Sequence, residues 1–287
     1  MATQATARLP YRLRSALGTA ILYAILLTIT CICLLPLYWL LRSSLMTNGE
    51  IFLFPPRLLP ANWKWDNYTK AFASFDAWKY GKNTMTILIP CVIGTVVTSA
   101  MCGYGFARIP FPGRKFWFML VIGAMILPGH VVLIPQYIMW SRLGAVNTYW
   151  PLTMGAFLGG GAGNIFLMRQ FFRTLPKEYD EAAIIDGCGY TKVFVSILLP
   201  LIQPIMITIA IFTFMGVWND FQGPLLYLQR ENKFTLALGL LTFRGSYSSR
   251  WNYLMAASAA MIVPAIFLFA IGQKYFLEGI TLTGIKG

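Results

Sequence analysis

Charged residues are scarce in this chain: Asp, Glu, Lys and Arg make up only 11% of its 287 residues, whereas soluble domains carry about 25%. Hydrophobic residues account for 57%, and the mean hydropathy is +0.62. This composition excludes an ordinary soluble enzyme, a disordered segment and a disulfide-rich secreted module. It predicts a membrane protein with room for about six spans of ~20 residues and no large soluble domain.

The residue types that catalysis inside a membrane requires are also lacking. The chain has one histidine and five cysteines, without a Cys-x-x-Cys pair, so the sequence predicts neither a zinc site nor a disulfide framework. The phosphate-binding pattern Gly-x4-Gly-Lys-Ser/Thr does not occur in it, so we expect no ATP and no other cofactor bound by this chain. A hydrolase would need clustered His, Asp or Glu in its spans, and we therefore expect the chain not to be an enzyme.

Positive charge exceeds negative charge, with 23 Lys and Arg against 10 Asp and Glu and a net charge of +13. These basic residues are spread over all the polar gaps and do not form a stripe that could follow a nucleic-acid backbone. We interpret them as topology signals and as contacts with anionic headgroups of the lipid bilayer. No nucleic-acid partner is expected.

Six uncharged stretches are long enough to cross a bilayer as helices. They are Ser15–Leu41, Asn83–Ala107, Phe116–Ser141, Leu143–Met168, Val193–Asn219 and Trp251–Gln273. We expect an all-α protein in which residues 15–287 form a single transmembrane domain of six helices, preceded by a cytoplasmic segment at residues 1–14. The first stretch is too long for a signal peptide and lacks a cleavage site after it, so we expect an uncleaved anchor.

The basic residues also predict which side each loop faces. The short gap Arg108–Lys115 between the second and third stretches contains three basic residues, and short loops follow the positive-inside rule best. Both termini and the loop at residues 169–192 are then cytoplasmic. The long gaps at residues 42–82 and 220–250 lie outside; aromatic residues in the first form either an interfacial belt or a docking surface. The run Leu236–Leu241 in the second is too short to span, so we expect a re-entrant or surface helix there.

The most informative segment lies between the fourth and fifth stretches. Pro176 suits the first position of a helix, and the three acidic residues that follow it complement the positive end of the helix dipole. Gly187 is expected to end this helix as a C-cap glycine, and Thr191 to cap the start of a second helix. The sequence therefore predicts a short helix, a glycine turn and a second helix at the membrane surface.

This short helix has the features of a docking element. Ala182 and Ala183 have small side chains that allow another surface to approach closely, while Glu181 and Asp186 offer charge to a partner. The alternative is an amphipathic helix that rests on lipid headgroups. Acidic residues contact headgroups poorly, which favours a protein partner.

The spacing within this segment resembles a known family. Glu181-Ala182-Ala183, Gly187 and Ile197-Leu198-Leu199-Pro200 fit E-A-A-x3-G-x9-I-x-L-P without a departure. The pattern is similar to the signature loop of permease subunits of binding-protein-dependent ABC importers. Further local matches, among them Trp218-Asn219-Asp220-Phe221, resemble the carbohydrate-uptake branch, and the ending Gly279–Gly287 resembles the tail of the smaller maltose-type permease.

The resemblance implies a permease of a bacterial or archaeal cytoplasmic (inner) membrane that forms half of the pathway for a sugar or oligosaccharide. It implies pairing with a second, similar permease, with two ATPase subunits that bind ATP and Mg, and with an extracytoplasmic solute-binding protein. The short helix would be a coupling helix that docks on an ATPase subunit. The residues implied in this coupling are Glu181, Ala182, Ala183, Asp186, Gly187, Ile197, Leu199 and Pro200.

Two further sets of residues are expected at functional positions. The family implies a second ATPase contact at the tail, formed by Gly284, Ile285, Lys286 and Gly287, although a disordered tail is the alternative. For the substrate pathway we expect His130, Trp218 and Asn219. His130 alternatively satisfies backbone carbonyls that nearby prolines leave free, and the glycines at residues 159–161 either allow close packing of a neighbouring helix or loosen the span.

Two other functions remain open. The same architecture could import a non-neutral solute such as glycerol phosphate or an acidic oligosaccharide. The chain could also be an independent carrier or channel, but no span contains Asp, Glu, Lys or Arg, and proton-coupled carriers generally need such a group.

Overall fold

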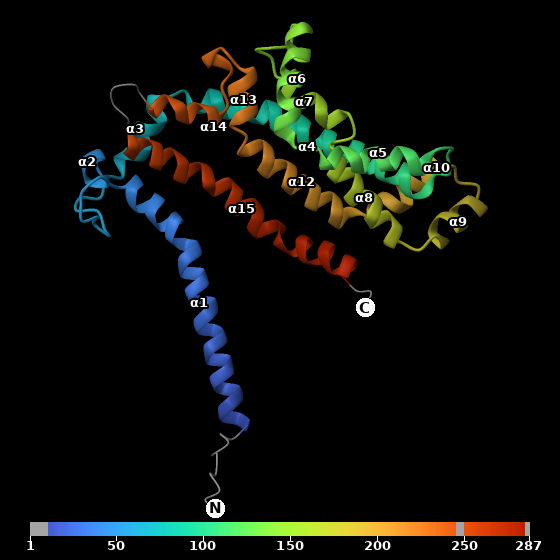
Figure 1. Ribbon diagram of the computed structural model, residues 1–287, viewed down its shortest axis with the longest axis horizontal. Helices are drawn as coiled ribbons and strands as arrows, with labels where there is room; N and C mark the ends of the chain where they lie inside the picture. Colours follow the sequence, from blue (N-terminus) through green and yellow to red (C-terminus); the bar gives the residue numbers. More distant parts are fainter. Residues whose placement is uncertain (1–10, 245–249, 285–287) are drawn as a thin grey trace, which may run out of the picture. The chain divides into compact units, whose positions relative to one another are not determined.

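The computed structural model describes the backbone of residues 11–244 and 250–284 and the side chains of residues 18–244 and 250–273. Within these ranges the chain forms helices and no β-strand (Figure 1). The α-helices are α1 (Tyr11–Ser44), α2 (Asn48–Ile51), α3 (Asp66–Ser74), α4 (Ala77–Arg108), α5 (Arg114–Ile126), α6 (Gly129–Arg142), α7 (Trp150–Phe157), α8 (Ala162–Thr174), α9 (Glu178–Ile185), α10 (Tyr190–Lys192), α11 (Leu199–Leu201), α12 (Gln203–Trp218), α13 (Gln222–Tyr227), α14 (Leu236–Gly239) and α15 (Trp251–Gly284). A π-helix covers Val193–Leu198, and 3-10 turns cover Glu231–Lys233 and Leu240–Phe243.

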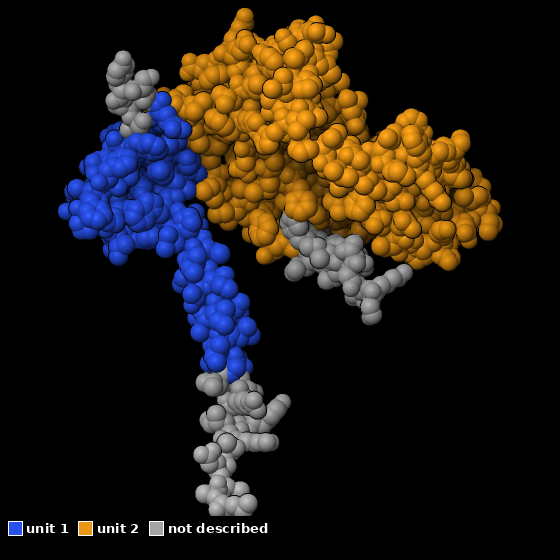
Figure 2. Space-filling view, viewed as in Figure 1, with its two compact units in different colours: residues 1–71, 243–260 blue, residues 72–242, 261–287 orange. Residues whose placement is uncertain are grey.

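The chain divides into two compact units, which Figure 2 shows in different colours. The first comprises residues 1–71 and 243–260, and the second comprises residues 72–242 and 261–287. In the first unit, the buried Asn67 amide donates hydrogen bonds to the carbonyls of Ser44 and Met46, both at 2.8 Å. Its carbonyl accepts one from the Asn252 amide at 3.1 Å. One buried side chain thus joins the end of α1, α3 and the start of α15.

Three of the six expected spans are confirmed as long apolar helices. They are Gly18–Ser44 within α1, Ala77–Arg108, which is α4, and Trp251–Gln273 within α15. Their length follows from uncharged sequence of sufficient extent for the hydrocarbon core. In the most apolar 18-residue window of the first of these helices, no residue is buried by the rest of the described chain.

The third and fifth expected spans are each formed by two helices that meet at a sharp bend. Helices α5 and α6 meet at 101°, and the α10–α11 segment meets α12 at 77°. At the first bend Leu127 is extended, with ψ 121°, because the residue before a proline avoids the helical conformation. At the second, Pro204 has no N–H to donate to the carbonyl four residues earlier, and the backbone leaves helical geometry at Ile202. Up to five spans are present if each bent pair crosses once.

The fourth expected span is not one continuous helix. Helix α7 ends at Phe157 and α8 begins at Ala162, and the three glycines between residues 159 and 161 all have positive φ angles. Such angles are incompatible with a right-handed helix and are accessible mainly to glycine. A Cβ on Gly160 would lie 2.7 Å from the carbonyl oxygen of Thr95. The glycines therefore both break the helix and allow α4 to approach.

The core of the second unit lies where α4 packs against α7, α8 and α12. Gly103 permits the closest approach, since a Cβ there would lie 2.5 Å from the Cβ of Met168. Around this contact the core residues are Val96, Ala100, Tyr104, Met168, Phe171, Phe172, Ala183, Val193, Leu198, Ile202, Ile205 and Ile209. Helix α4 is therefore the element against which the rest of this unit is organised.

The short helix expected at Leu236–Leu241 is present as α14 and the 3-10 turn after it. Its first amide donates to the hydroxyl of Thr84 on α4 at 3.0 Å, and Thr235 caps its start through the amide of Leu238. Ala237, Leu238 and Gly239 are buried. This helix therefore packs on α4 within the protein.

Candidate functional site

Helix α9 forms the short element predicted between the fourth and fifth stretches. It ends in a Schellman turn: the Gly187 N–H donates to the carbonyl of Ile184 at 3.0 Å, and the Cys188 N–H donates to that of Ala183 at 2.9 Å. Gly187 has φ +79°, so the predicted C-cap glycine is confirmed. The predicted cap at Thr191 is wrong, because the next helix begins at Tyr190 after Gly189, without a side-chain cap.

The start of α9 is attached to the end of α4 by a buried ion pair. The Nη1 of Arg108 lies 3.2 Å from the Oδ2 of Asp180, and the two side chains are only 7% and 13% exposed. The Nη2 of Arg108 also donates to the carbonyl of Leu175 at 2.7 Å. Burial raises the pKa of the Asp180 carboxyl above its ordinary value, and the Arg108 guanidinium opposes that rise. The pair therefore holds a charge that would be costly to bury alone.

The residues that follow α9 are also attached to α4, one helical turn before Arg108. The hydroxyl of Tyr104 donates to the carbonyl of Tyr190 at 3.1 Å, and its ring lies 5.0 Å from that of Phe194. Tyr104 and Arg108 are four residues apart and so share one face of α4. Both ends of the α9 segment are thus fixed to the last turns of α4.

The implied coupling residues divide into a buried set and an exposed set. Ala183 is 5% exposed and belongs to the chain's own core, and Ile197 and Leu199 pack against that core. In contrast, Glu181, Ala182, Asp186, Gly187 and Pro200 are exposed. Of the two alanines, only Ala182 lies where another protein could reach it.

Sequence reasoning missed several residues of this segment. Ile185 is 85% exposed, and Tyr179 and Ile184 are also exposed. Tyr179, Ala182 and Ile185 recur every three residues and therefore share one face of α9. The three-residue spacing of these side chains could have been found from the sequence. The Arg108–Asp180 ion pair could not, because the two residues are far apart in the chain.

The residues expected on the substrate pathway lie at helix ends. His130 is exposed at the second position of α6, directly after the sharp bend. Trp218 is 6% exposed at the end of α12, where its Nε1 donates to the carbonyl of Met261 at 2.9 Å. Asn219 is exposed, and its amide donates to the carbonyl of Met215 at 2.8 Å.

The expected tail contact is only partly within the described chain. Gly284 is the last residue of α15. Ile285, Lys286 and Gly287 lie outside the described residues.

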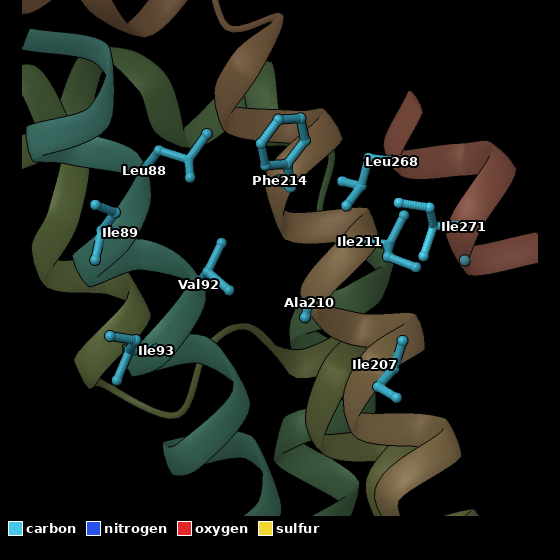
Figure 3. A pocket seen from close by; sticks show the side chains of 11 residues that line it. Leu88, Ile89, Val92, Ile93, Ile207, Ala210, Ile211, Phe214, Leu268 and Ile271 are labelled. Carbon is cyan, nitrogen blue, oxygen red and sulfur yellow. The ribbon is translucent and has the colours of Figure 1, made fainter. Parts of the chain in front are cut away.

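A cavity of about 340 Å³ lies between α4, α12 and α15, and Figure 3 shows the side chains that line it. Its described lining consists of Leu88, Ile89, Val92, Ile93, Ile207, Ala210, Ile211, Phe214, Leu268, Ile271 and Gly272. A sugar needs hydrogen-bonding groups to replace its water, and these side chains offer none. The cavity suits an apolar helix or a lipid chain.

Comparisons with known proteins agree on the family. The profile of the binding-protein-dependent transport system inner membrane component matches residues 95–281. An arabinooligosaccharides transport system permease, AraQ of Halalkalibacterium halodurans, is 35% identical over 85% of this chain and 86% of its own length. The probable ABC transporter permease YurM of Bacillus subtilis is 34% identical over 88% of this chain and 83% of its own length.

A solved structure shares the fold. The structure is that of a bacterial ABC transporter involved in the import of the acidic polysaccharide alginate, and one of its chains superposes with a TM-score of 0.80. The match covers 92% of this chain and 98% of that one, at 22% identity. The expected all-helical permease fold is therefore confirmed at the level of overall architecture.

Proposed function

The chain belongs to the family of inner membrane components of binding-protein-dependent transport systems, and we propose that it imports a sugar or oligosaccharide as half of a translocation pathway. Members of this family are permease subunits of ABC importers, not enzymes, and ATP is hydrolysed by a separate subunit. The similarity to permeases for arabinooligosaccharides and for maltodextrin supports a sugar as the solute.

The coupling proposal rests on how α9 is held and what it exposes. Helix α9 is fixed to α4 through Arg108 and Tyr104, and it presents an apolar face with Ile185 at its end. Tyr179, Ile184 and Ile185 are all exposed on this short helix outside the expected spans, and a group of exposed apolar side chains indicates a surface that a partner covers. In our proposal a cytoplasmic ATPase subunit covers this face. Closure of the ATPase pair then moves α9, and α4 carries the motion to α7, α8 and α12.

The second permease is proposed on the exposed apolar surface of this chain. The long apolar helix within α1 has no buried residue in its most apolar window, and the cavity between α4, α12 and α15 is lined only by apolar side chains in the part of the chain described. Helix association in a membrane depends on close van der Waals packing. A partner helix would supply that packing at either surface.

The topology remains a proposal with six crossings and both termini in the cytoplasm. Backbone that leaves helical geometry at membrane depth is tolerated only where protein or water satisfies it. The bend before His130, the glycine break after α7 and the bend at Ile202 are therefore expected to face the pathway or a neighbouring helix, not lipid. His130, Trp218 and Asn219 remain the proposed pathway residues, and Gly284–Gly287 the proposed tail contact.

The test is reconstitution with two ATPase subunits, a partner permease and a solute-binding protein of the same transport system. We expect ATP hydrolysis that the loaded binding protein stimulates, and sugar uptake that requires ATP. Ala182→Asp should weaken retention of the ATPase by ~10-fold or more, since it adds a charge at the exposed contact. Glu178→Gln on the same helix is the matched control and should retain it.

Two results would contradict this function. Sugar movement by this chain without any ATPase would indicate an independent carrier or channel. A binding protein that takes glycerol phosphate or an acidic oligosaccharide, but no neutral sugar, would assign the same architecture to a non-neutral solute.

A further inference from the structure

A second cavity, of about 530 Å³, lies beside the α9 attachment and is strongly basic. Six of its nine described lining residues are cationic: Arg108, Arg114, Lys115, Arg169, Arg173 and Lys177. They come from the end of α4, the start of α5, the end of α8 and the residue before α9. No carboxylate is among the described residues that line it. Like charges gathered this closely repel one another unless an anion lies between them.

Most of these cations have no counter-charge within the described part of the chain. Of the six, only Arg108 forms an ion pair in the described part of the chain, with Asp180. The Nε of Arg108 is buried there without a hydrogen-bond partner. Burial and the neighbouring guanidinium groups of Arg173 and Arg114 lower the pKa of Arg169 below its ordinary value. The cavity therefore holds five positive charges that no described residue of its lining neutralises.

Two of the arginines are held in place, so the positive charge is pre-organised. The Nε of Arg169 donates to the carbonyl of Phe106 at 3.3 Å, and its guanidinium lies 3.7 Å from the centre of the Phe118 ring. The Nη1 of Arg114 donates to the carbonyl of Ile109 at 3.3 Å. A site whose cations are already oriented loses less entropy when an anion binds.

The start of α5 shows that local structure does not account for these charges. Arg114 and Lys115 lie in its first turn, which has no acidic residue and no side-chain cap. Positive charge at a helix N-terminus opposes the helix dipole. A topology signal needs only the number of charges on one side of the membrane. It does not need cations from four segments to line one cavity.

We propose that this cavity binds the phosphate-bearing headgroup of an anionic phospholipid. The shared chemistry would also suit free phosphate, but the surroundings favour an amphiphile. Directly after Lys115, α5 exposes the apolar side chains of Phe116, Met119 and Leu120. A lipid would place its headgroup among the cations and its acyl chains along this apolar surface. The inference depends on the proposed function only for placing the cavity at the cytoplasmic face.

A bound lipid here would reach the coupling segment directly. Arg108 lines the cavity and also attaches α9, and Lys177 lines it immediately before α9 begins. An anion in the cavity would reduce the repulsion among cations that come from α4, α5, α8 and the residue before α9, and would so hold these segments together. The lipid would thus stabilise the position of α9.

The experiment counts lipids bound to the purified full-length chain by mass spectrometry of the intact complex in detergent. The probes are phosphatidylglycerol, phosphatidylcholine with matched acyl chains, and inorganic phosphate. The variant Lys115→Gln/Arg173→Gln removes two cations that have no carboxylate within 4 Å in the described chain. Each charge near a surface contributes about a fivefold preference for anionic lipid, so the affinity for phosphatidylglycerol should fall about 30-fold.

Two controls separate a site from general surface charge and from misfolding. Arg142→Gln removes one exposed cation that does not line the cavity, and it should retain phosphatidylglycerol like the wild type. Lys115→Arg/Arg173→Lys keeps both charges and should restore binding. No ATPase, binding protein or sugar is present in this experiment. A negative result would therefore not contradict the import function, and failure of the import test would not contradict lipid binding.

Three outcomes would overturn the proposal. Equal binding of phosphatidylglycerol and phosphatidylcholine by the wild type would exclude headgroup recognition. Displacement of phosphatidylglycerol by inorganic phosphate, at concentrations near the dissociation constant of phosphate itself, would assign the cavity to a free anion. Equal losses in the cavity variant and in Arg142→Gln would show non-specific attraction to charge.

Discussion

Breaking the Arg108–Asp180 ion pair should weaken the attachment of α9 to α4. The variant Asp180→Asn removes the carboxylate charge and preserves side-chain size. It leaves the Arg108 guanidinium, of which only 7% is exposed, without its opposite charge. The bond from Arg108 to the carbonyl of Leu175 remains, so the helix loses one attachment and is not unfolded.

The magnitude follows from the burial of both partners. Removing one partner from a buried ion pair costs about 3–5 kcal/mol. We take the lower end, about 3 kcal/mol, because Arg108 keeps a backbone acceptor and borders a large cavity. That corresponds to about 100-fold in the equilibrium between attached and released α9. Replacing both partners in Arg108→Met/Asp180→Leu should recover most of this loss, because neither charge is then buried alone.

The assay is hydrogen exchange of the α9 amides in the reconstituted chain. Protection of these amides should fall by up to ~100-fold in Asp180→Asn and return in the double variant. Glu178→Gln removes an acidic residue from the same first turn that is exposed and forms no ion pair in the described chain, and it serves as the control. Equal protection in Asp180→Asn and Glu178→Gln would refute the reasoning.

The pH dependence of α9 protection provides a second test of the Arg108–Asp180 ion pair. In Arg108→Met the Asp180 carboxyl loses the group that lowers its pKa, while the burial that raises it remains. A carboxyl whose folded pKa is raised destabilises the folded segment when it is ionised, at pH above that pKa. The penalty should therefore shrink as the pH falls. A defect in α9 protection that is independent of pH would show that an uncompensated carboxylate is not its cause.

Three further predictions concern the turn, the topology and the tail. Gly187→Pro removes the N–H that bonds to Ile184 and forbids the observed φ of +79°, so the chain should insert normally but lose ATPase coupling; stimulated hydrolysis at wild-type rates would contradict this. On a cysteine-free background, a cysteine at position 66 should react with an impermeant reagent in intact cells and one at the exposed position 185 should not; labelling at 185 would reverse the orientation. Removing Gly284–Gly287 should leave assembly intact and weaken the coupling of hydrolysis to uptake, and unchanged coupling would exclude a role for the tail.

The sequence was sufficient for the features that depend on one local property. Uncharged length predicts α1, α4 and α15, because the hydrocarbon core sets a minimum length for an apolar helix. The end of α9 was predictable because a glycine after a helical stretch adopts positive φ without steric cost. The short helix at α14 followed from an apolar run too brief to span the bilayer.

Features that depend on contacts between distant residues were not predictable. A short helix has two faces, and the sequence of α9 does not show that Ala183 faces the core while Ala182 faces outward. The Arg108–Asp180 pair joins segments far apart in the chain, and neither residue has a distinctive local signal. The bends were missed because a proline in a membrane helix is often accommodated by its neighbours with only a mild kink.

The failures of local reasoning cluster at the places where the proposed pathway needs irregular backbone. The bend at Pro128, the glycine break at residues 159–161 and the bend at Ile202 all interrupt stretches that are apolar enough to be ordinary spans. Interrupting a helix at membrane depth frees backbone groups that lipid cannot satisfy. A sequence keeps such interruptions only where another requirement outweighs their cost. Close packing on α4 accounts for the glycine break, because Gly160 nearly touches Thr95. At the bend before His130 the neighbouring side chains of Leu127 and Val131 are exposed, so this is the position at which a substitution that straightens the helix, such as Pro128→Ala, should alter transport more than it alters assembly.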